Sequence, residues 1–233
     1  MQTVILCGGK GTRLGEASEK IPKPMMLVGE KPILWHIMKL YASQGFNDFI
    51  LCLGYKGKNI KEYFEKSNHE NWKIQFVDTG EDTTKSERLE KVKDLINGEN
   101  FFLSYGDDLA NIDFSKLLKF HEYMGLTATI TGVRLISHFG IVEMNEENII
   151  TNFREKPILD HWMNGGFMVL NKRIFDYLNA GEFEDKVLPL LAQTKQICSY
   201  KHKGEWKSMN TLKDNIELNE MWLKGKAFWK IWK

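Results

Sequence analysis

The stretch Thr3–Leu14, which reads TVILCGGKGTRL, decides the fold. It begins as a short apolar, β-branched run that is typical of a buried strand, and it passes directly into a glycine-rich turn. In an open α/β sheet, ligands bind beyond the carboxyl ends of the strands, so this turn is the first candidate site. Gly8, Gly9 and Gly11 allow a phosphate to approach the backbone N–H groups closely. Arg13 adds a guanidinium that can hold two phosphate oxygens at once.

Two familiar phosphate-binding motifs are excluded at this turn. A Walker A loop requires GKS or GKT after its last glycine, whereas Gly11 is followed by Thr12 and Arg13. The dinucleotide fingerprint GxGxxG requires glycine where this chain has Leu14. The turn therefore predicts a phosphate site of another class.

Strand-like and helix-like segments alternate through the first half of the chain, and strands are more frequent in the second half. The expected strands are Thr3–Cys7, Phe49–Leu53, Lys73–Val77, Phe101–Ser104, Ala128–Val133, Phe139–Val142, Ile149–Phe153 and Gly166–Leu170. The expected helices are Ile33–Tyr41, Ile60–Phe64, Ser86–Ile96, Phe114–Met124, Glu184–Ala192 and Lys213–Leu223. Strands separated by helices of about ten residues predict βαβ units and a mostly parallel sheet with helices on both faces.

We therefore expect a single α/β domain over residues 1–233. Its central sheet is mixed but mostly parallel. Residues 1–125 form the half that binds a nucleotide, and residues 126–233 form the half that binds a second substrate and end in a helical tail.

The composition excludes several classes of protein. A content of 42% hydrophobic and 27% charged residues is typical of a soluble globular chain. The net charge of +1 gives no reason to expect nucleic acid as a partner. No apolar run is long enough to predict a membrane span, and we see no secretory start. The three cysteines form no CxxC pair, so we expect a reducing, cytoplasmic setting.

Three further motifs follow predicted strands or turns. Pro22-Lys23-Pro24 holds a lysine on a stiffened segment, and Tyr105-Gly106-Asp107-Asp108 places carboxylates after a strand, where Mg²⁺ bound to phosphate would lie. Phe153-Arg154-Glu155-Lys156-Pro157 puts an acid beside a base. Read singly, these motifs are also compatible with a surface turn, a helix N-cap region and a solvated charge pair. Their shared position after strands favours one common site.

The motifs GGKGTRL, IPKPM, YGD, EKP and NGGF occur in this order, and the chain thereby resembles the sugar-phosphate nucleotidyltransferase family. The similarity is greatest to the cytidylyltransferase branch that acts on glucose 1-phosphate, and it extends over essentially the whole chain. The resemblance implies a Rossmann-like nucleotidyltransferase domain. It also implies transfer of CMP from CTP to a small phosphorylated acceptor with release of pyrophosphate, in polysaccharide or capsule biosynthesis.

The resemblance also implies roles for individual residues. The residues expected to be catalytic are Arg13, Lys23 and Lys156. Those expected to bind the nucleotide are Gly8, Gly9, Gly11, Thr12, Thr79, Gly80, Arg88 and Asp107. Those expected to bind the acceptor are Gly140, Glu155, Lys156, Asn164 and Gly165. The expected cofactor is Mg²⁺, held by Asp107 and Asn210.

One metal position departs from the pattern of this family. Relatives have an aspartate where this chain has Asn210, which offers an oxygen but no charge. Asp108 stands where relatives often have glycine, and we expect it to replace the missing charge. The hypothesis at this point is a weaker affinity for Mg²⁺ than in a relative with two aspartates.

Several alternatives remain open from the sequence. The acceptor could be a non-sugar phosphate such as L-glutamine phosphate, as in capsule phosphoramidate synthesis. The chain could also be a catalytically silent nucleotide-binding regulator, for which Asn210 is the one argument. Trp222, Trp229 and Trp232 crowd the tail, where they could pack on their own domain or form a subunit contact. We expect a homo-oligomer.

Overall fold

A seven-stranded sheet forms the centre of the computed structural model, which describes residues 1–11, 21–67 and 70–232. In spatial order its strands are β12 (Ile197–Lys201), β8 (Ala128–Val133), β11 (Met163–Asn171), β6 (Asn100–Tyr105), β1 (Gln2–Leu6), β4 (Asp48–Leu53) and β5 (Lys73–Asp78). Within this sheet, β11 runs antiparallel to β6 and β8, and the other neighbouring pairs are parallel. The predicted mixed, mostly parallel sheet is confirmed.

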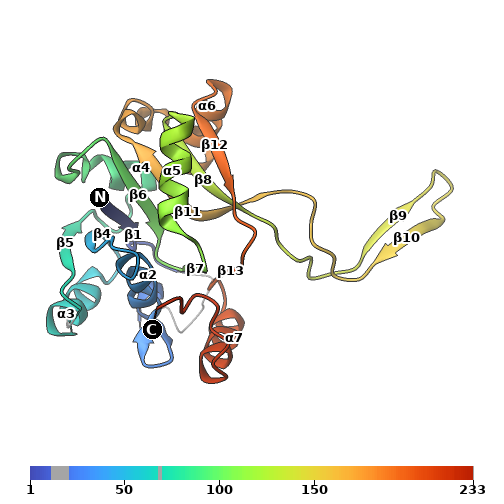
Figure 1. Cartoon of the computed structure of the whole chain (residues 1–233), viewed down its shortest axis with the longest axis horizontal. Helices are drawn as coiled ribbons and strands as arrows, with labels where there is room; N and C mark the ends of the chain where they lie inside the picture. The colour runs from blue at the N-terminus through green and yellow to red at the C-terminus, as the bar shows by residue number, and fades with distance from the viewer. Residues whose placement is uncertain (12–20, 68–69, 233) are drawn as a thin grey trace.

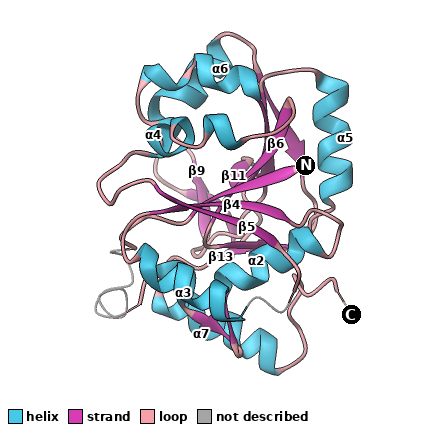
Figure 2. Cartoon of the chain, turned by 90° about the vertical axis from the view of Figure 1, so that its left-hand side faces the viewer, coloured by secondary structure: helices cyan, strands magenta, loops and turns pink. Residues whose placement is uncertain are grey.

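Strand β1 explains why helices cover both faces of the sheet. Its side chains alternate between two apolar clusters: Val4 and Leu6 belong to one, and Ile5 to the other. One cluster includes residues of α2 (Ile33–Ala42), α3 (Gly57–Ser67), α5 (Phe114–Met124) and α7 (Leu212–Leu223). The other includes residues of α4 (Lys85–Glu90) and α6 (Leu188–Gln193). Figure 2 shows α2 and α3 on the side of the sheet opposite to α4 and α6.

Local chemistry sets the helix ends, and two predicted helices differ from the structure. Helix α5 matches its prediction: Asp113 accepts a hydrogen bond from the N–H of Lys116, and a left-handed Gly125 ends the helix. The helix predicted over Ser86–Ile96 is shorter in the structure. Helix α4 ends at Glu90, and a separate 3-10 turn, η3 (Lys93–Leu95), follows it.

The segment predicted as Glu184–Ala192 begins as a π turn, η6 (Phe183–Val187), before α6. Pro189 at the start of α6 has no N–H for the regular helical bond, which accounts for the irregular entry. Two short 3-10 helices, η4 (Lys172–Asp176) and η5 (Leu178–Ala180), precede this turn.

A long arm leaves the sheet between β8 and β11 (Figure 1). It contains β9 (Ile141–Met144) and β10 (Ile150–Arg154), which pair with each other in antiparallel orientation. The sequence predicted strands at Phe139–Val142 and Ile149–Phe153; the structure has them one or two residues later in the chain and pairs them in a ribbon separate from the central sheet. Val133 and Met163 are paired neighbours, so the arm starts and returns at the same place in the sheet.

Smaller ribbons complete the body. β7 (Asp108–Ala110) pairs with β13 (Trp206–Ser208), and β2 (Leu27–Val28) pairs with β3 (Lys31–Pro32). A short 3-10 turn, η2 (Lys23–Met25), precedes β2. In the tail, Trp229 is fully buried and its indole N–H donates to His36 Nδ1 at 3.4 Å. Within the described ranges no helix is long and apolar enough to cross a membrane.

Candidate active site

A cavity of about 650 Å³ lies where β1 and β6 end, side by side. The chain runs from β1 to β4 and β5 on one side and returns to β6 on the other, so this is the point where the strand order reverses. Such a point is where ligands bind in open α/β sheets. Gly8 and Gly9 after β1, and Gly106 and Asp107 after β6, line the cavity.

The described part of the glycine-rich turn is closely packed. Gly11 has a φ of +64°, and a Cβ added there would lie 2.9 Å from Lys23 Cβ. A Cβ on Gly8 would lie 2.2 Å from the Arg88 guanidinium. Glycine is therefore required at both positions, and all three predicted glycines line the cavity. Thr12 and Arg13 lie outside the described residues.

Arg88 lines the cavity and holds two loops together. It is 4% exposed, and its guanidinium donates to the carbonyl oxygens of Gly8, Leu53 and Glu81 at 3.3, 3.2 and 3.1 Å. It also donates to Thr79 Oγ1 at 2.6 Å. Through these hydrogen bonds Arg88 positions the turn after β1 against the loop after β5.

The predicted Thr79 and Gly80 belong to this support rather than to the cavity wall. Thr79 is fully buried, and the wall is formed instead by residues that follow it, among them Glu81, Thr83, Thr84 and Lys85. Thr84 starts α4 with a capping box completed by Glu87, which fixes this segment beside the cavity. These residues were not among the predicted site residues, and the Thr84–Glu87 spacing was the signal that could have marked them.

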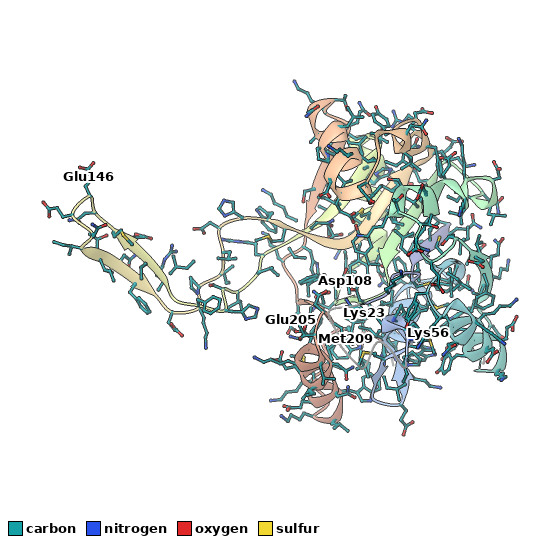
Figure 3. The ribbon with its side chains drawn as sticks, turned by 180° about the vertical axis from the view of Figure 1, so that it is seen from behind. Lys23, Lys56, Asp108, Glu146, Glu205 and Met209 are labelled. Carbon is teal, nitrogen blue, oxygen red and sulfur yellow. The ribbon has the colours of Figure 1, made fainter. Side chains whose placement is uncertain are left out.

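Lys23, Asp107 and Asn210 meet on the cavity wall although they are far apart in the sequence. Lys23 Nζ contacts Asp107 Oδ2 and donates to Asn210 Oδ1 at 3.1 Å. The Met209 N–H donates to the Asp107 carbonyl at 2.9 Å, which ties the segment after β13 to the end of β6. Figure 3 shows Lys23, Asp108 and Met209 together in the body of the protein.

Helix α7 begins at Leu212, with Thr211 as its N-cap, and its first turn fixes Asn210. The Asp214 carboxylate accepts hydrogen bonds from the backbone N–H groups of Asn210 and Thr211 at 3.0 and 2.8 Å. The Asn210 amide also donates to Ser208 Oγ at 3.1 Å, so its Oδ1 is directed to Lys23. The structure therefore brings together the two residues predicted to hold a metal.

Asp108 lines the same cavity next to Asp107, and its role as a second negative charge stays a prediction. Asp108 is 4% exposed, and its carboxylate lies against Gly166, where a Cβ would come within 2.1 Å of Oδ2. Burial raises the pKa of Asp108 well above its usual value, and the Asp107 carboxylate raises it further. A hydrogen bond with Ser208 and the charges of Lys23 and Lys85 lower the same pKa, and Asp108 packs β7 against β11 through Gly166.

The predicted acceptor residues fall into two groups. Asn164 lines the cavity, and its Oδ1 accepts a hydrogen bond from the Gly166 N–H at 3.0 Å. Gly165 is buried next to it, and its carbonyl accepts a hydrogen bond from the Trp206 indole N–H at 2.8 Å. Gly140, Glu155 and Lys156 lie on the arm instead. These three do not line the cavity of their own chain, and the side chains of Glu155 and Lys156 are more than half exposed.

Known proteins share this architecture. The family profile for nucleotidyl transferases matches residues 2–225. The chain belongs to the nucleotidyl transferase family. It is an enzyme that transfers nucleotidyl groups.

Three relatives illustrate the likeness. A probable glucose-1-phosphate cytidylyltransferase of Bacillus subtilis (strain 168) is 44% identical over 255 residues that cover both chains completely. The glucose-1-phosphate cytidylyltransferase of Salmonella typhi is 39% identical over 257 residues, again with complete coverage. The crystal structure of HddC from Yersinia pseudotuberculosis is 26% identical, covers 95% of this chain and 99% of that chain, and has a TM-score of 0.75.

The oxygen donors of this nucleotidyltransferase fit a divalent cation. Asp107 offers a carboxylate and Asn210 an amide oxygen, both hard ligands of the kind that Mg²⁺ prefers. The Lys23 ammonium already contacts both oxygens, which marks their midpoint as favourable for positive charge. Because Mg²⁺ usually takes only one or two protein carboxylates besides substrate phosphates and water, such a small donor set is sufficient.

Proposed function

We propose that this nucleotidyltransferase transfers CMP from CTP to glucose 1-phosphate, forming CDP-glucose and pyrophosphate. The observation that carries the proposal is the meeting of Lys23, Asp107 and Asn210 beside a glycine-rich turn, in a chain that matches glucose-1-phosphate cytidylyltransferases along its entire length. In this reaction an acceptor phosphate oxygen attacks the α-phosphorus, and the bond to the β-phosphate breaks. The attacking phosphate is already ionised at neutral pH, so the enzyme needs no general base.

The protein's task is to align anions and to neutralise their charge. Gly8, Gly9, Gly11 and Thr12 would hold the triphosphate, and Arg13 the departing pyrophosphate. Lys23 would contact the nucleotide near the α-phosphorus. Mg²⁺, when bound by Asp107 and Asn210, would neutralise phosphate charge. Arg88 and Thr79 act on the nucleotide through the loops that they fix.

The arm supports a proposal about oligomeric state. Its paired strands put Val142, Met144, Ile150 and Phe153 on one face, each 40–59% exposed. The other face is polar, with Arg154 Nη2 3.2 Å from Glu143 Oε1. A two-stranded ribbon is marginally stable alone, and an apolar face of this kind marks an interaction site. We propose that the chain forms a homo-oligomer through the arm.

In that assembly the arm would complete the active site of another copy. Lys156 stands outside its own cavity and has a φ of +44°, a conformation that is costly for a residue with a side chain and concentrates at functional sites. Lys156, with Glu155 and Gly140, would therefore hold the acceptor phosphate and sugar at the cavity of a neighbouring chain. We also propose a cytoplasmic location, in keeping with three free cysteines.

The first experiment measures pyrophosphate release with Mg²⁺ and each nucleoside triphosphate, against glucose 1-phosphate and L-glutamine phosphate. Release with CTP and glucose 1-phosphate is the expected result. Release only with CTP and the amino acid phosphate would replace the acceptor, and release only with another triphosphate would replace the nucleotide. No pyrophosphate release with any pair of triphosphate and acceptor would contradict the proposed reaction. Arg13→Ala and Lys156→Ala should each lower turnover about 100- to 1000-fold, with the fold intact.

A complementation experiment tests the shared site. Lys23→Ala and Lys156→Ala chains are each expected to be nearly inactive alone. After mixing and reassembly in equal amounts, about one quarter of the sites would combine an intact Lys23 with an intact Lys156 from another chain, and activity should return to that extent. If both lysines serve the cavity of a single chain, mixing would restore nothing.

A further inference from the structure

A second cavity, of about 590 Å³, lies at the end of α7 that is remote from the active site. Trp35, Trp222 and Trp232 line it together with Leu223, and we call it the tryptophan cavity. Its walls are fixed by close packing: Gly29 has a φ of +62°, and a Cβ there would lie 2.3 Å from the Trp222 indole nitrogen. A concave, mostly apolar site whose lining side chains are held by close packing is typical of a binding site, so we expect a ligand or another protein surface to bind there.

The rim of the tryptophan cavity is basic. Lys31 Nζ lies 5.7 Å from the centre of the Trp35 ring, and Lys230 Nζ lies 5.4 Å from that of Trp222. In the part of the chain that the structure describes, neither lysine forms an ion pair. Glu30 is the acid among the lining residues. The cavity therefore suits an occupant with apolar side chains and negative charge.

The end of the arm has this chemistry. Met144, Ile149 and Ile150 are 55%, 59% and 58% exposed there, and the turn between the strands carries Glu146 and Glu147. Figure 3 shows Glu146 at the far end of the arm, well away from the body. The arm tip (residues 144–150) therefore offers apolar side chains for the tryptophan cavity and negative charge for its basic rim.

The spacing of the two contacts also agrees. Helix α7 begins after Asn210 at the active site and ends at Leu223 in the tryptophan cavity, and its 12 residues span about 18 Å. Lys156 lies six positions after Ile150 on the arm, which at about 3.3 Å per residue spans at most about 20 Å. An arm whose Lys156 reaches a neighbouring active site therefore has the length to bring its tip to that neighbour's tryptophan cavity.

We propose that the tryptophan cavity receives the arm tip of a second copy of this chain. The inference rests on the proposed function, which puts Lys156 of one copy at the active site of another. The arm and the cavity are different surfaces, so two copies can exchange arms reciprocally, or several can close a ring. Docking of the tip would hold the arm at two points and set the position of Lys156 over the neighbouring cavity.

Disulfide trapping between chains tests the contact directly. One chain carries Ile149→Cys and the other carries Leu223→Cys, a position that is 81% exposed at the cavity. Both carry Cys198→Ser, because Cys7 and Cys52 are buried and Cys198 is partly accessible. Oxidation of the mixed assembly should give a linked pair of chains. The matched control replaces Leu223→Cys with Tyr123→Cys on α5, which is 86% exposed and should give at least tenfold less product.

Charge reversal supplies an independent measurement. Lys230→Glu should raise the dissociation constant of the assembly at least tenfold in sedimentation velocity, and Glu146→Lys with Glu147→Lys in the same chain should restore it. Lys119→Glu, an exposed reversal on α5, should leave association unchanged. An unchanged dissociation constant for Lys230→Glu, or no rescue, would overturn the docking.

The outcomes separate this inference from the proposed function. An oligomer that releases pyrophosphate but gives no Ile149–Leu223 product refutes docking at the tryptophan cavity and leaves the reaction standing. A wild-type chain that is monomeric at every concentration and fully active refutes both the docking and the shared site. A trapped pair of chains that turns over no substrate supports the docking and contradicts the reaction.

Discussion

Replacing Asn210 by aspartate changes the charge beside Asp107 with almost no change in shape. In the structure Asn210 Oδ1 faces Lys23 Nζ at 3.1 Å, and Lys23 also contacts Asp107. The backbone of Asn210 is held by Asp214 and does not depend on the side-chain amide. Asn210→Asp therefore adds one negative charge at a fixed position where a divalent cation is proposed to bind.

The size of the effect follows from the charges. Two unit charges about 4 Å apart interact by about 4 kcal/mol at an effective dielectric constant near 20, and a divalent cation doubles that value. The Lys23 ammonium gains only the single-charge interaction, so the new carboxylate favours Mg²⁺ over Lys23. Solvent and the desolvation of the carboxylate remove most of the difference. A remainder of about 1.4 kcal/mol corresponds to a tenfold change in affinity, which we take as the lower bound.

The assay is the Mg²⁺ concentration that gives half-maximal pyrophosphate release, with direct titration of Mn²⁺ into the CTP complex as a readout that needs no turnover. Both should shift to at least tenfold lower metal concentration in Asn210→Asp. Asn179→Asp, an exposed change in η5 with the same charge, controls for net charge and should not shift either value. Equal midpoints for wild type and Asn210→Asp would refute the placement of the metal between Asp107 and residue 210.

Three further changes have outcomes that the structure determines. Arg88→Met removes the hydrogen bonds of a buried guanidinium to the carbonyl oxygens of Gly8, Leu53 and Glu81, and should lower the free energy of unfolding in urea by about 3 kcal/mol. Gly166→Ala, at a φ of +79° with Asp108 Oδ2 2.1 Å from the new Cβ, should cost about 3 kcal/mol, whereas Gly98→Ala at a φ of +89° in open space should cost about 1 kcal/mol. Burial lowers the pKa of His36 to about 4, so the unfolded chain binds its proton first and stability falls as pH drops from 6.5 towards 4. The loss of unfolding free energy is about 3 kcal/mol. It should be isolated by measuring the free energy of unfolding in urea against pH for wild type and His36→Gln and taking the difference. Parallel pH profiles of the two proteins would contradict it.

The order of strands and helices was largely predictable because it depends on local patterns. Alternation in β1 reflects two buried faces, and the spacing of Asp113 and Gly125 around α5 marks both of its ends. The irregular entry to α6 was not predicted, because the effect of Pro189 depends on how the preceding turn packs.

The site was predictable to the extent that each motif follows a strand. Asp107 and Asn210 were named from their motifs, and the structure brings them to one lysine. The hydrogen bonds of Arg88 to the two loops were not predictable, because a buried guanidinium bonded to carbonyls and an exposed one have the same sequence signature. Whether a side chain faces the cavity or supports it depends on distant partners such as Gly8 and Gly166.

The paired positions Val133 and Met163 have a consequence for how this chain can vary. Everything between them leaves and re-enters the sheet at adjacent residues, so the whole segment is a cassette that can be shortened or exchanged while the sheet register is kept. A hybrid carrying the corresponding segment of a relative would retain its nucleotide cavity and, through the proposed arm contact, change the copies with which it assembles. In such a protein, partner choice can evolve separately from the chemistry of nucleotide binding.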